Sequence, residues 1–253
     1  MPRPDLAQLV AELEEEQASL QAVLAEIEPD QWLVPTPAEG WDVRDTVSHL
    51  ADTDEIAVDT VLGGPRSLND EAARFDAPEA FTLSACLKGR TMTGAEVLAW
   101  WERASQRERD VLLAADPSAR VPWGLGMLVP SLVTARVMET WAHGLDIRAA
   151  LGAPDHDTDT NLSHVAWIGT RALPYAFSVA GREMPPGDLR VELDLPSGAI
   201  WSHGPPEAAD RITGPASEYC RLFVQRITRA SATGLKAEGD LADVALEVAR
   251  AYL

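Results

Sequence analysis

Glu139 and His143 stand four residues apart in a segment whose pattern predicts a helix. On an α-helix this spacing places both side chains on one face, one turn apart. A carboxylate and an imidazole in that arrangement are two potential ligands of a divalent metal ion. A third ligand has to come from another part of the chain, and His49, in a second predicted helix, is the best candidate. We therefore expect His49, Glu139 and His143 to bind one metal ion between two helices.

Two neighbouring features favour this interpretation over chance, because an isolated Glu-x-x-x-His spacing is common in helices. Asp52 and Asp146 each follow a histidine by three residues, so either carboxylate could orient an imidazole ring. The alternative is that both aspartates simply face solvent. Gly144, next to His143, leaves room for a close approach in a helix where glycine costs about 1 kcal/mol relative to alanine.

Two histidines and one glutamate suit Zn²⁺, with coordination positions left open for water or substrate. The ligand types also admit Mn²⁺, Fe²⁺ or Ni²⁺. An open site of this kind serves Lewis-acid catalysis or the activation of a bound water or thiol. A thiol bound to zinc is deprotonated and becomes a nucleophile at neutral pH.

Four long helices must position these residues. Hydrophobic periodicity predicts them at about residues 6–27, 41–62, 93–116 and 131–151. We expect residues 66–93 to form a long connection that includes one short helix, around residues 80–89. This pattern is typical of a four-helix bundle, in which facing helices supply metal ligands.

The composition changes after Pro154, where a polar stretch indicates a domain boundary. Beyond it the pattern predicts strands at 189–195 and 199–202 that pair as a hairpin, and helices at about 162–177, 217–229 and 241–252. The predicted fold is therefore mainly α. A four-helix-bundle domain, residues 1–154, binds the metal, and a smaller α+β domain follows at residues 155–253.

The charge of the 253-residue chain limits its partners. With 21 basic and 40 acidic residues, the formal net charge is −19, which opposes binding to nucleic acids and to anionic membranes. No apolar stretch approaches the ~20 residues that span a bilayer, and the residues from Met1 to Asp5 show no signal peptide. Cys86 and Cys220 are expected to be reduced thiols. We expect a cytoplasmic monomer or homodimer.

Two segments carry a resemblance to a known family. The segment GWDVRDTVSHL, residues 40–50, resembles the GWSVRDVVAHL segment in the metal-binding domain of mycothiol-dependent maleylpyruvate isomerases, which belong to the DinB/YfiT-like superfamily of four-helix bundles. The segment ETWAHGLDI, residues 139–147, resembles that family's second metal segment, E-x-x-x-H-x-x-D-[LI]. The resemblance implies that His49, Glu139 and His143 are the metal ligands. Most of the superfamily uses three histidines, so Glu139 points to the mycothiol branch.

The C-terminal third is similar to the small α+β domain of the same family, over residues 210–219 and at Gly239-Asp240. In this chain Gln225-Arg226 replaces the family's usual Gly-Arg. By resemblance, Arg226 is the catalytic arginine that faces the carboxylates of the substrate. The alternative is an ordinary solvated arginine on a helix, and the replaced glycine leaves the identity of the substrate open.

The resemblance implies a zinc-dependent isomerase or S-transferase that uses mycothiol as its thiol cosubstrate and acts on a small electrophilic molecule, for which carboxylate groups are expected. Two alternatives stay open because they share the fold and the ligands. One is a non-catalytic metal-binding DinB-like protein with a stress or regulatory role. The other is a metal-dependent tailoring enzyme that needs no thiol.

Overall fold

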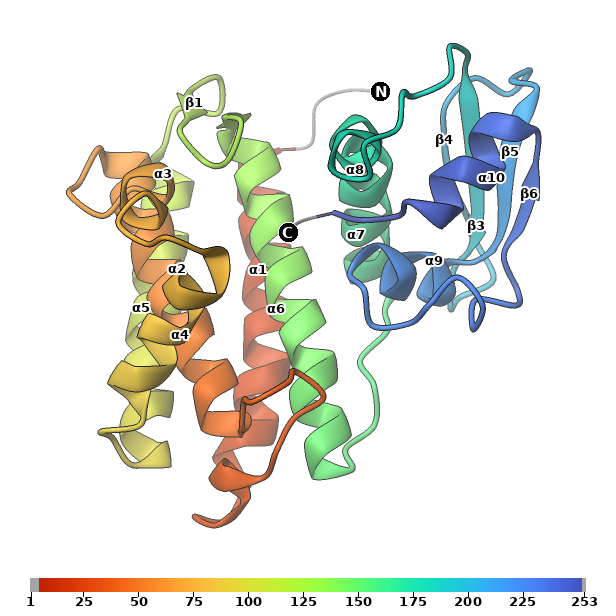
Figure 1. Ribbon diagram of the computed structural model, residues 1–253. Coiled ribbons are helices and arrows are strands. Elements are labelled where there is room, and N and C mark those ends of the chain that lie inside the picture. Colours follow the sequence, from red (N-terminus) through yellow and green to blue (C-terminus); the bar gives the residue numbers. More distant parts are fainter. Residues whose placement is uncertain (1–4, 252–253) are drawn as a thin grey trace. The chain divides into compact units, whose positions relative to one another are not determined.

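The computed structural model describes residues 5–251 of a mainly helical chain with two small sheets (Figure 1). The described residues up to His156 form one compact unit, and those from Asp157 onward form a second. Residues 1–4, on which the expectation about a signal peptide rests, lie outside the described residues. No helix within residues 5–251 is long and apolar enough to cross a lipid bilayer.

The first unit is a four-helix bundle, as predicted, and its long helices stand side by side in Figure 1. They are α1 (Leu6–Ala25), α2 (Val43–Leu62), α5 (Gly94–Ala114) and α6 (Val129–Leu151). The predicted caps are present: the side chain of Asp42 accepts a hydrogen bond from the backbone N–H of Asp45 before α2, and Thr93 with Glu96 forms a capping box before α5. The sequence therefore fixes where these helices start.

The connections in this unit are more ordered than the sequence indicates. They contain η1 (Gln31–Leu33), α3 (Leu68–Ala72), α4 (Pro78–Gly89), β1 (Arg120–Val121) and β2 (Met127–Leu128). The expectation of a single short helix between α2 and α5 is wrong, because α3 precedes α4. The loop before α6 is a short antiparallel hairpin of β1 and β2. Apart from α4, which was expected, these pieces are too short for hydrophobic periodicity to reveal them.

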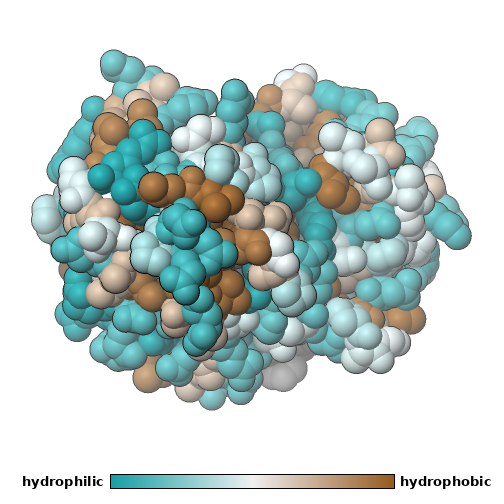
Figure 2. Space-filling model, turned by 90° about the horizontal axis from the view of Figure 1, so that it is seen from below, coloured by the Kyte–Doolittle hydropathy of each residue, from teal (hydrophilic) through white to brown (hydrophobic). Residues whose placement is uncertain are grey.

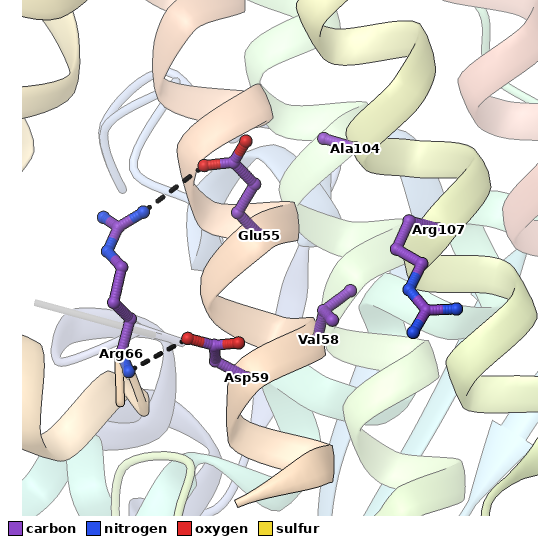
Figure 3. A pocket seen from close by; sticks show the side chains of 6 residues that line it. All are labelled: Glu55, Val58, Asp59, Arg66, Ala104 and Arg107. Atoms are coloured by element: carbon purple, nitrogen blue, oxygen red, sulfur yellow. Dashed lines mark hydrogen bonds and ion pairs between the residues drawn. The ribbon is translucent and has the colours of Figure 1, made fainter. Parts of the chain in front are cut away.

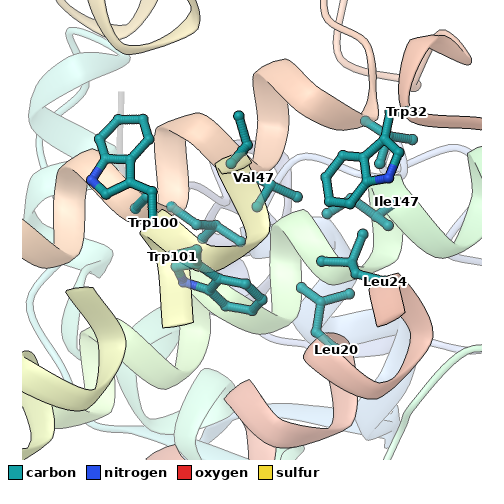
Figure 4. Close-up of a cluster of buried hydrophobic side chains, with 11 residues drawn as sticks. Leu20, Leu24, Trp32, Val47, Trp100, Trp101 and Ile147 are labelled. Carbon is teal, nitrogen blue, oxygen red and sulfur yellow. The ribbon is translucent and has the colours of Figure 1, made fainter. Parts of the chain in front are cut away.

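The apolar faces of the four long helices meet in one buried cluster (Figure 4). Leu20 of α1, Val47 of α2, Trp101 of α5 and Ile147 of α6 each contribute to it, and each is at most 1% exposed. Close packing of this kind holds neighbouring helices at fixed separations. On the outside, Figure 2 shows a mainly hydrophilic face with hydrophobic side chains at several separate places.

A fully buried polar network lies within the same bundle. Arg136 of α6 donates through Nη2 to Oδ1 of Asp54 on α2 (2.6 Å) and through Nε to Oε1 of Glu108 on α5 (3.0 Å). Gln17 of α1 donates to the other oxygen of Glu108 (3.0 Å). Each of these side chains is at most 1% exposed, so the bonds form in a dry interior where they are strong and orientation-dependent.

The second unit is smaller and α+β, as predicted. Its helices are α7 (Asp159–Arg171), α8 (Leu173–Val179), α9 (Ala216–Phe223) and α10 (Asp240–Glu247). Its strands are β3 (Leu189–Asp194), β4 (Ile200–His203), β5 (Asp210–Pro215) and β6 (Lys236–Glu238), in the order β4-β3-β5-β6. The predicted hairpin is present: β3 pairs with β4 antiparallel, with Val191 opposite His203.

Several details of this unit correct the sequence-based expectations. The single helix expected at 162–177 is two helices, and Pro174 at the start of α8 cannot donate a helical hydrogen bond. Strands β5, parallel to β3, and β6 were not predicted. The last helix ends at Glu247, and residue 252, where it was expected to end, lies outside the described residues.

The buried network predicts a pH-dependent stability. Burial raises the pKa of Glu108 well above 4.5; the neighbouring Asp54 carboxylate adds to this effect and Arg136 opposes it. Burial likewise raises the pKa of Asp54, against the pull of Arg136. The raised pKa of Glu108 means that its contribution to stability is present below about pH 4.5 and is lost as the pH rises toward its folded value.

We expect Glu108→Gln, which keeps the shape but cannot ionise, to become progressively more stable relative to the unsubstituted protein as the pH rises above about 5. The gain has an upper limit of about 1.4 kcal/mol per pH unit. Urea denaturation at a series of pH values measures it. Glu102→Gln, at an exposed position of the same helix, serves as the control. A stability difference for Glu108→Gln that does not change with pH would contradict the raised pKa of Glu108.

Candidate metal centre

The three predicted ligands converge between two helices of the bundle. His49 lies in the first half of α2, and Glu139 and His143 lie one turn apart on α6. One ligand atom from each residue lies within 4.8 Å of the others. The structure therefore brings together the residues that the sequence selected. That they bind a metal ion stays a prediction.

The spacing of the donor atoms fits a single ion. Oε1 of Glu139 lies 3.0 Å from Nε2 of His49 and 3.3 Å from Nε2 of His143. Ligands at about 2.0–2.1 Å from a tetrahedral zinc ion lie about 3.3 Å from one another. The two distances match that separation, and the donor set is the nitrogen and oxygen set that zinc accepts.

The protonation states also suit a cation. Burial lowers the pKa of His49 below its ordinary value of 6.5, against the opposing effect of Glu139. Burial alone would raise the pKa of Glu139, but the hydrogen bonds with His143 and His49 outweigh it and hold that pKa well below 4.5. At neutral pH the site therefore offers a carboxylate and a neutral imidazole at His49, which are the forms that metals bind.

Trp41 forms a wall of the site that sequence reasoning missed. Its ring stacks on His143, with 6.0 Å between centroids and an interplanar angle of 16°, and lies 5.1 Å from the ring of His49. Its carbonyl oxygen accepts a hydrogen bond from the backbone N–H of Thr36, which fixes the turn before α2. The available signal was its position directly before the Asp42 cap, since a residue there lies at the same end of α2 as His49.

The two aspartates that follow the histidines have different roles. Oδ2 of Asp146 lies 3.4 Å from Nδ1 of His143, the ring nitrogen that faces away from Glu139. Asp146 therefore lies beside that imidazole, and its role in orienting the ring stays a prediction. Asp52 instead accepts two hydrogen bonds from Arg66, at 2.9 and 3.0 Å. Both aspartates are at most 5% exposed, so the alternative that they face solvent is wrong.

Arg66 also lines a separate hollow of about 230 Å³ between α2 and α5 (Figure 3). Its guanidinium is committed to carboxylates, with Glu55 at 3.3 Å and Glu71 at 3.5 Å in addition to Asp52. None of the three candidate ligands lines this hollow. The charged groups around this hollow therefore tie the connection after α2 to that helix.

Gly144 does not have the expected role. A Cβ atom placed on it would meet Leu20 of α1 at 3.7 Å, which is ordinary van der Waals contact. The packing beside His143 therefore has room for alanine, and the expectation of a close approach that requires glycine is wrong.

The thiols of the chain itself are not available for this chemistry. Cys86 and Cys220 are free, as expected, and both are buried. Burial raises the pKa of Cys86 to about 12 and that of Cys220 well above its ordinary value. Because the thiolate is the reactive form, neither cysteine supplies a nucleophile at neutral pH.

Arg226 lies in the second unit, whereas the three candidate ligands lie in the first. The predicted helix around it is too long: α9 ends at Phe223, and Gln225 adopts the left-handed conformation (φ 59°). Two backbone bonds, from Gln225 to Leu222 and from Arg226 to Arg221, close this turn as a Schellman motif. Arg226 is thus half-buried in a turn, and its Nη1 donates to the carbonyl of Val224 (2.8 Å). Its contact with a substrate stays a prediction.

Comparisons with known proteins agree with this description. Residues 8–148 match the family model described as the mycothiol maleylpyruvate isomerase N-terminal domain. Two proteins without an assigned function, from two strains of Mycobacterium tuberculosis, are each 37% identical over 98% of this chain and 96% of their own length.

Two solved structures share the fold. They are crystal structures of the mycothiol-dependent maleylpyruvate isomerase and of a histidine-to-alanine mutant of it, with TM-scores of 0.61 and 0.62. Each match covers 92% of this chain and 93% of the other chain, at 17% and 16% identity. At this identity the likeness concerns the fold.

The turn at Gln225 gives a prediction about stability. A non-glycine residue in the left-handed region costs about 1–2 kcal/mol, and glycine removes this strain while losing about 0.5–1 kcal/mol of chain entropy. We therefore expect Gln225→Gly to stabilise the protein by about 0.5–1 kcal/mol, measured by urea denaturation. Gln225→Ala, which keeps the strain and loses the exposed bond to Arg250, should show no gain. Equal stabilities of the glycine and alanine variants would show that the turn is unstrained.

Proposed function

Because the chain belongs to the family of the mycothiol maleylpyruvate isomerase N-terminal domain, we propose that it is a metal-dependent enzyme that uses mycothiol. The reaction is an isomerisation or an S-transfer on a small electrophilic substrate that bears carboxylate groups. The observation that carries this proposal is the convergence of His49, Glu139 and His143 on one point between α2 and α6.

The residues fit a divalent ion, and we assign Zn²⁺. Two imidazole nitrogens and one carboxylate oxygen leave coordination positions for a further ligand. When bound, the ion supplies Lewis-acid chemistry that lowers the pKa of a coordinated thiol. Asp146 holds the ring of His143 in place, and Trp41 covers both imidazoles and excludes water from that side.

The thiol comes from outside the chain, because Cys86 and Cys220 are buried and protonated at neutral pH. In the proposed reaction the thiolate of mycothiol adds to the electrophilic carbon of the substrate. The addition breaks the π bond of a carbon–carbon double bond in the substrate, and the released electron pair moves toward the neighbouring carbon. If this pair re-forms the double bond after rotation and expels the same thiolate, the product is an isomer of the substrate. If the neighbouring carbon instead takes up a proton and the sulfur stays bound, the product is an S-conjugate.

Arg226 is the proposed catalytic partner of the substrate. A guanidinium can bind a carboxylate through two parallel hydrogen bonds. Gln225 stands where the family usually has glycine, and its backbone is left-handed, the conformation that glycine adopts most easily. A turn that accepts glycine directly before the arginine supports the assignment of Arg226 despite the replaced glycine.

The remaining proposals concern partners and place in the cell. The partners are the small substrate and mycothiol, and the net charge of −19 disfavours nucleic acids and anionic membranes. We place the protein in the cytoplasm, as a monomer or homodimer.

Two other functions are distinguished by ligand dependence. A non-catalytic protein with a stress or regulatory role would bind metal without activating a thiol. A tailoring enzyme of the same fold would need the metal but no thiol. The open coordination positions expected for two histidines and one glutamate favour catalysis over a purely structural ion.

The test is elemental analysis of the purified protein together with calorimetric titration of mycothiol. We expect about one zinc ion per chain, mycothiol binding that requires the metal, and the loss of both in His49→Ala. His203→Ala, a histidine of β4 in the second unit, is the matched control and should retain both.

Protein without stoichiometric metal, purified without chelators, would contradict the metal-dependent function. Protein that holds metal but binds no mycothiol would contradict the thiol cosubstrate and would favour the thiol-independent enzyme.

A further inference from the structure

The two helices that carry the candidate ligands are also joined by a second, buried contact. Arg136 lies one turn before Glu139 on α6, and Thr53 and Asp54 lie just over one turn after His49 on α2. Nη2 of Arg136 donates to Oδ1 of Asp54 (2.6 Å) and to Oγ1 of Thr53 (3.0 Å). The ligands and this contact therefore form two successive contacts between α2 and α6.

The contact made by Arg136 is connected to the backbone of a candidate ligand. The hydroxyl of Thr53 accepts a hydrogen bond from Arg136 and donates one to the carbonyl oxygen of His49 (2.9 Å). A continuous path of hydrogen bonds thus runs from the guanidinium on α6 to the residue on α2 that faces Glu139. Among the described residues, no other hydrogen bond links the backbone of His49 to α6.

We propose that Arg136 is a positioning residue of the metal centre, which holds α2 and α6 in the register at which His49 meets Glu139. This inference rests on the proposed metal-dependent function. Arg136 does not contact any of the three candidate ligands. It acts by fixing the helix on which His49 is carried.

The physical basis is the shape and burial of the guanidinium. Its planar fork binds partners in fixed directions, unlike the flexible ammonium group of lysine. Arg136 and Asp54 are each about 1% exposed, so water does not replace their bonds if the helices slide. Glu108 of α5 accepts a hydrogen bond from Nε of the same guanidinium. The guanidinium is therefore held by α5 as well and cannot move with α6 alone. The register of the two helices is therefore tied to one side chain.

A second buried arginine on α6 provides a matched control. Arg148 is 6% exposed and donates to Oγ and the backbone oxygen of Ser19 on α1. It ties α6 to α1, and within residues 5–251 no hydrogen bond joins it to α2. Replacing either arginine with lysine removes a planar guanidinium from the interior. Only Arg136→Lys disturbs the pair of helices that carries the ligands.

The experiment measures zinc affinity in the full-length chain by competition with a chromophoric chelator, at a temperature where circular dichroism shows every variant to be folded. We expect Arg136→Lys and Thr53→Val each to weaken zinc binding by about tenfold or more, the lower end of the range for residues that orient ligands. Arg148→Lys should bind zinc as the unsubstituted protein does. Thr53→Val keeps the size of the side chain and removes only its hydroxyl, so it tests the link to His49 if Arg136→Lys does not fold.

The visible absorption of cobalt-substituted protein adds a spectroscopic signature. It should change in Arg136→Lys and Thr53→Val, because the ligand geometry changes, and should be unchanged in Arg148→Lys. Unchanged zinc affinity and unchanged spectra in both Arg136→Lys and Thr53→Val, in a protein that does bind zinc, would overturn the positioning role and leave the proposed function intact. An equal loss in all three variants would also overturn it, because the effect would be general destabilisation. Absence of zinc binding in the unsubstituted protein would overturn the proposed function and the positioning role with it.

Discussion

One oxygen atom of Glu139 lies between imidazole nitrogens that come from two different helices, and the candidate site depends on that contact. It requires α2 and α6 to lie at one separation and in one register. The separation is set by the apolar cluster in which all four long helices share side chains. The register is set by hydrogen bonds and ion pairs that join the helices in fixed directions. In the described residues, Arg136 makes the buried bonds of this kind.

The bundle interior therefore combines two kinds of interaction with different consequences. Apolar packing stabilises the helices but tolerates small displacements, because it has no preferred direction. The network of Asp54, Glu108 and Arg136 contributes little net stability for its size, since charges lose their hydration on burial, but it specifies how the helices meet. Its two carboxyl groups face one guanidinium, and burial raises the pKa of both acids while Arg136 opposes that effect.

The sequence predicted the features that depend on regular spacing along long helices. The four long helices, two of their caps and the meeting of His49, Glu139 and His143 follow from spacing and periodicity. Elements without a clear pattern did not follow: β5 and β6 lack alternating hydrophobic residues, and α3 lies in a segment without periodicity. Contacts between distant segments were also hidden. Nothing near Asp52 shows that Arg66 binds it, and nothing in the loop before α2 shows that Trp41 covers the two imidazoles.

The most direct test of the account is X-ray diffraction from crystals of the full-length protein, recorded above and below the zinc absorption edge. The account predicts one anomalous peak within about 2.0–2.2 Å of Nε2 of His49, a carboxylate oxygen of Glu139 and Nε2 of His143. A zinc ion bound elsewhere, or these three side chains turned away from one another with no peak between them, would contradict it.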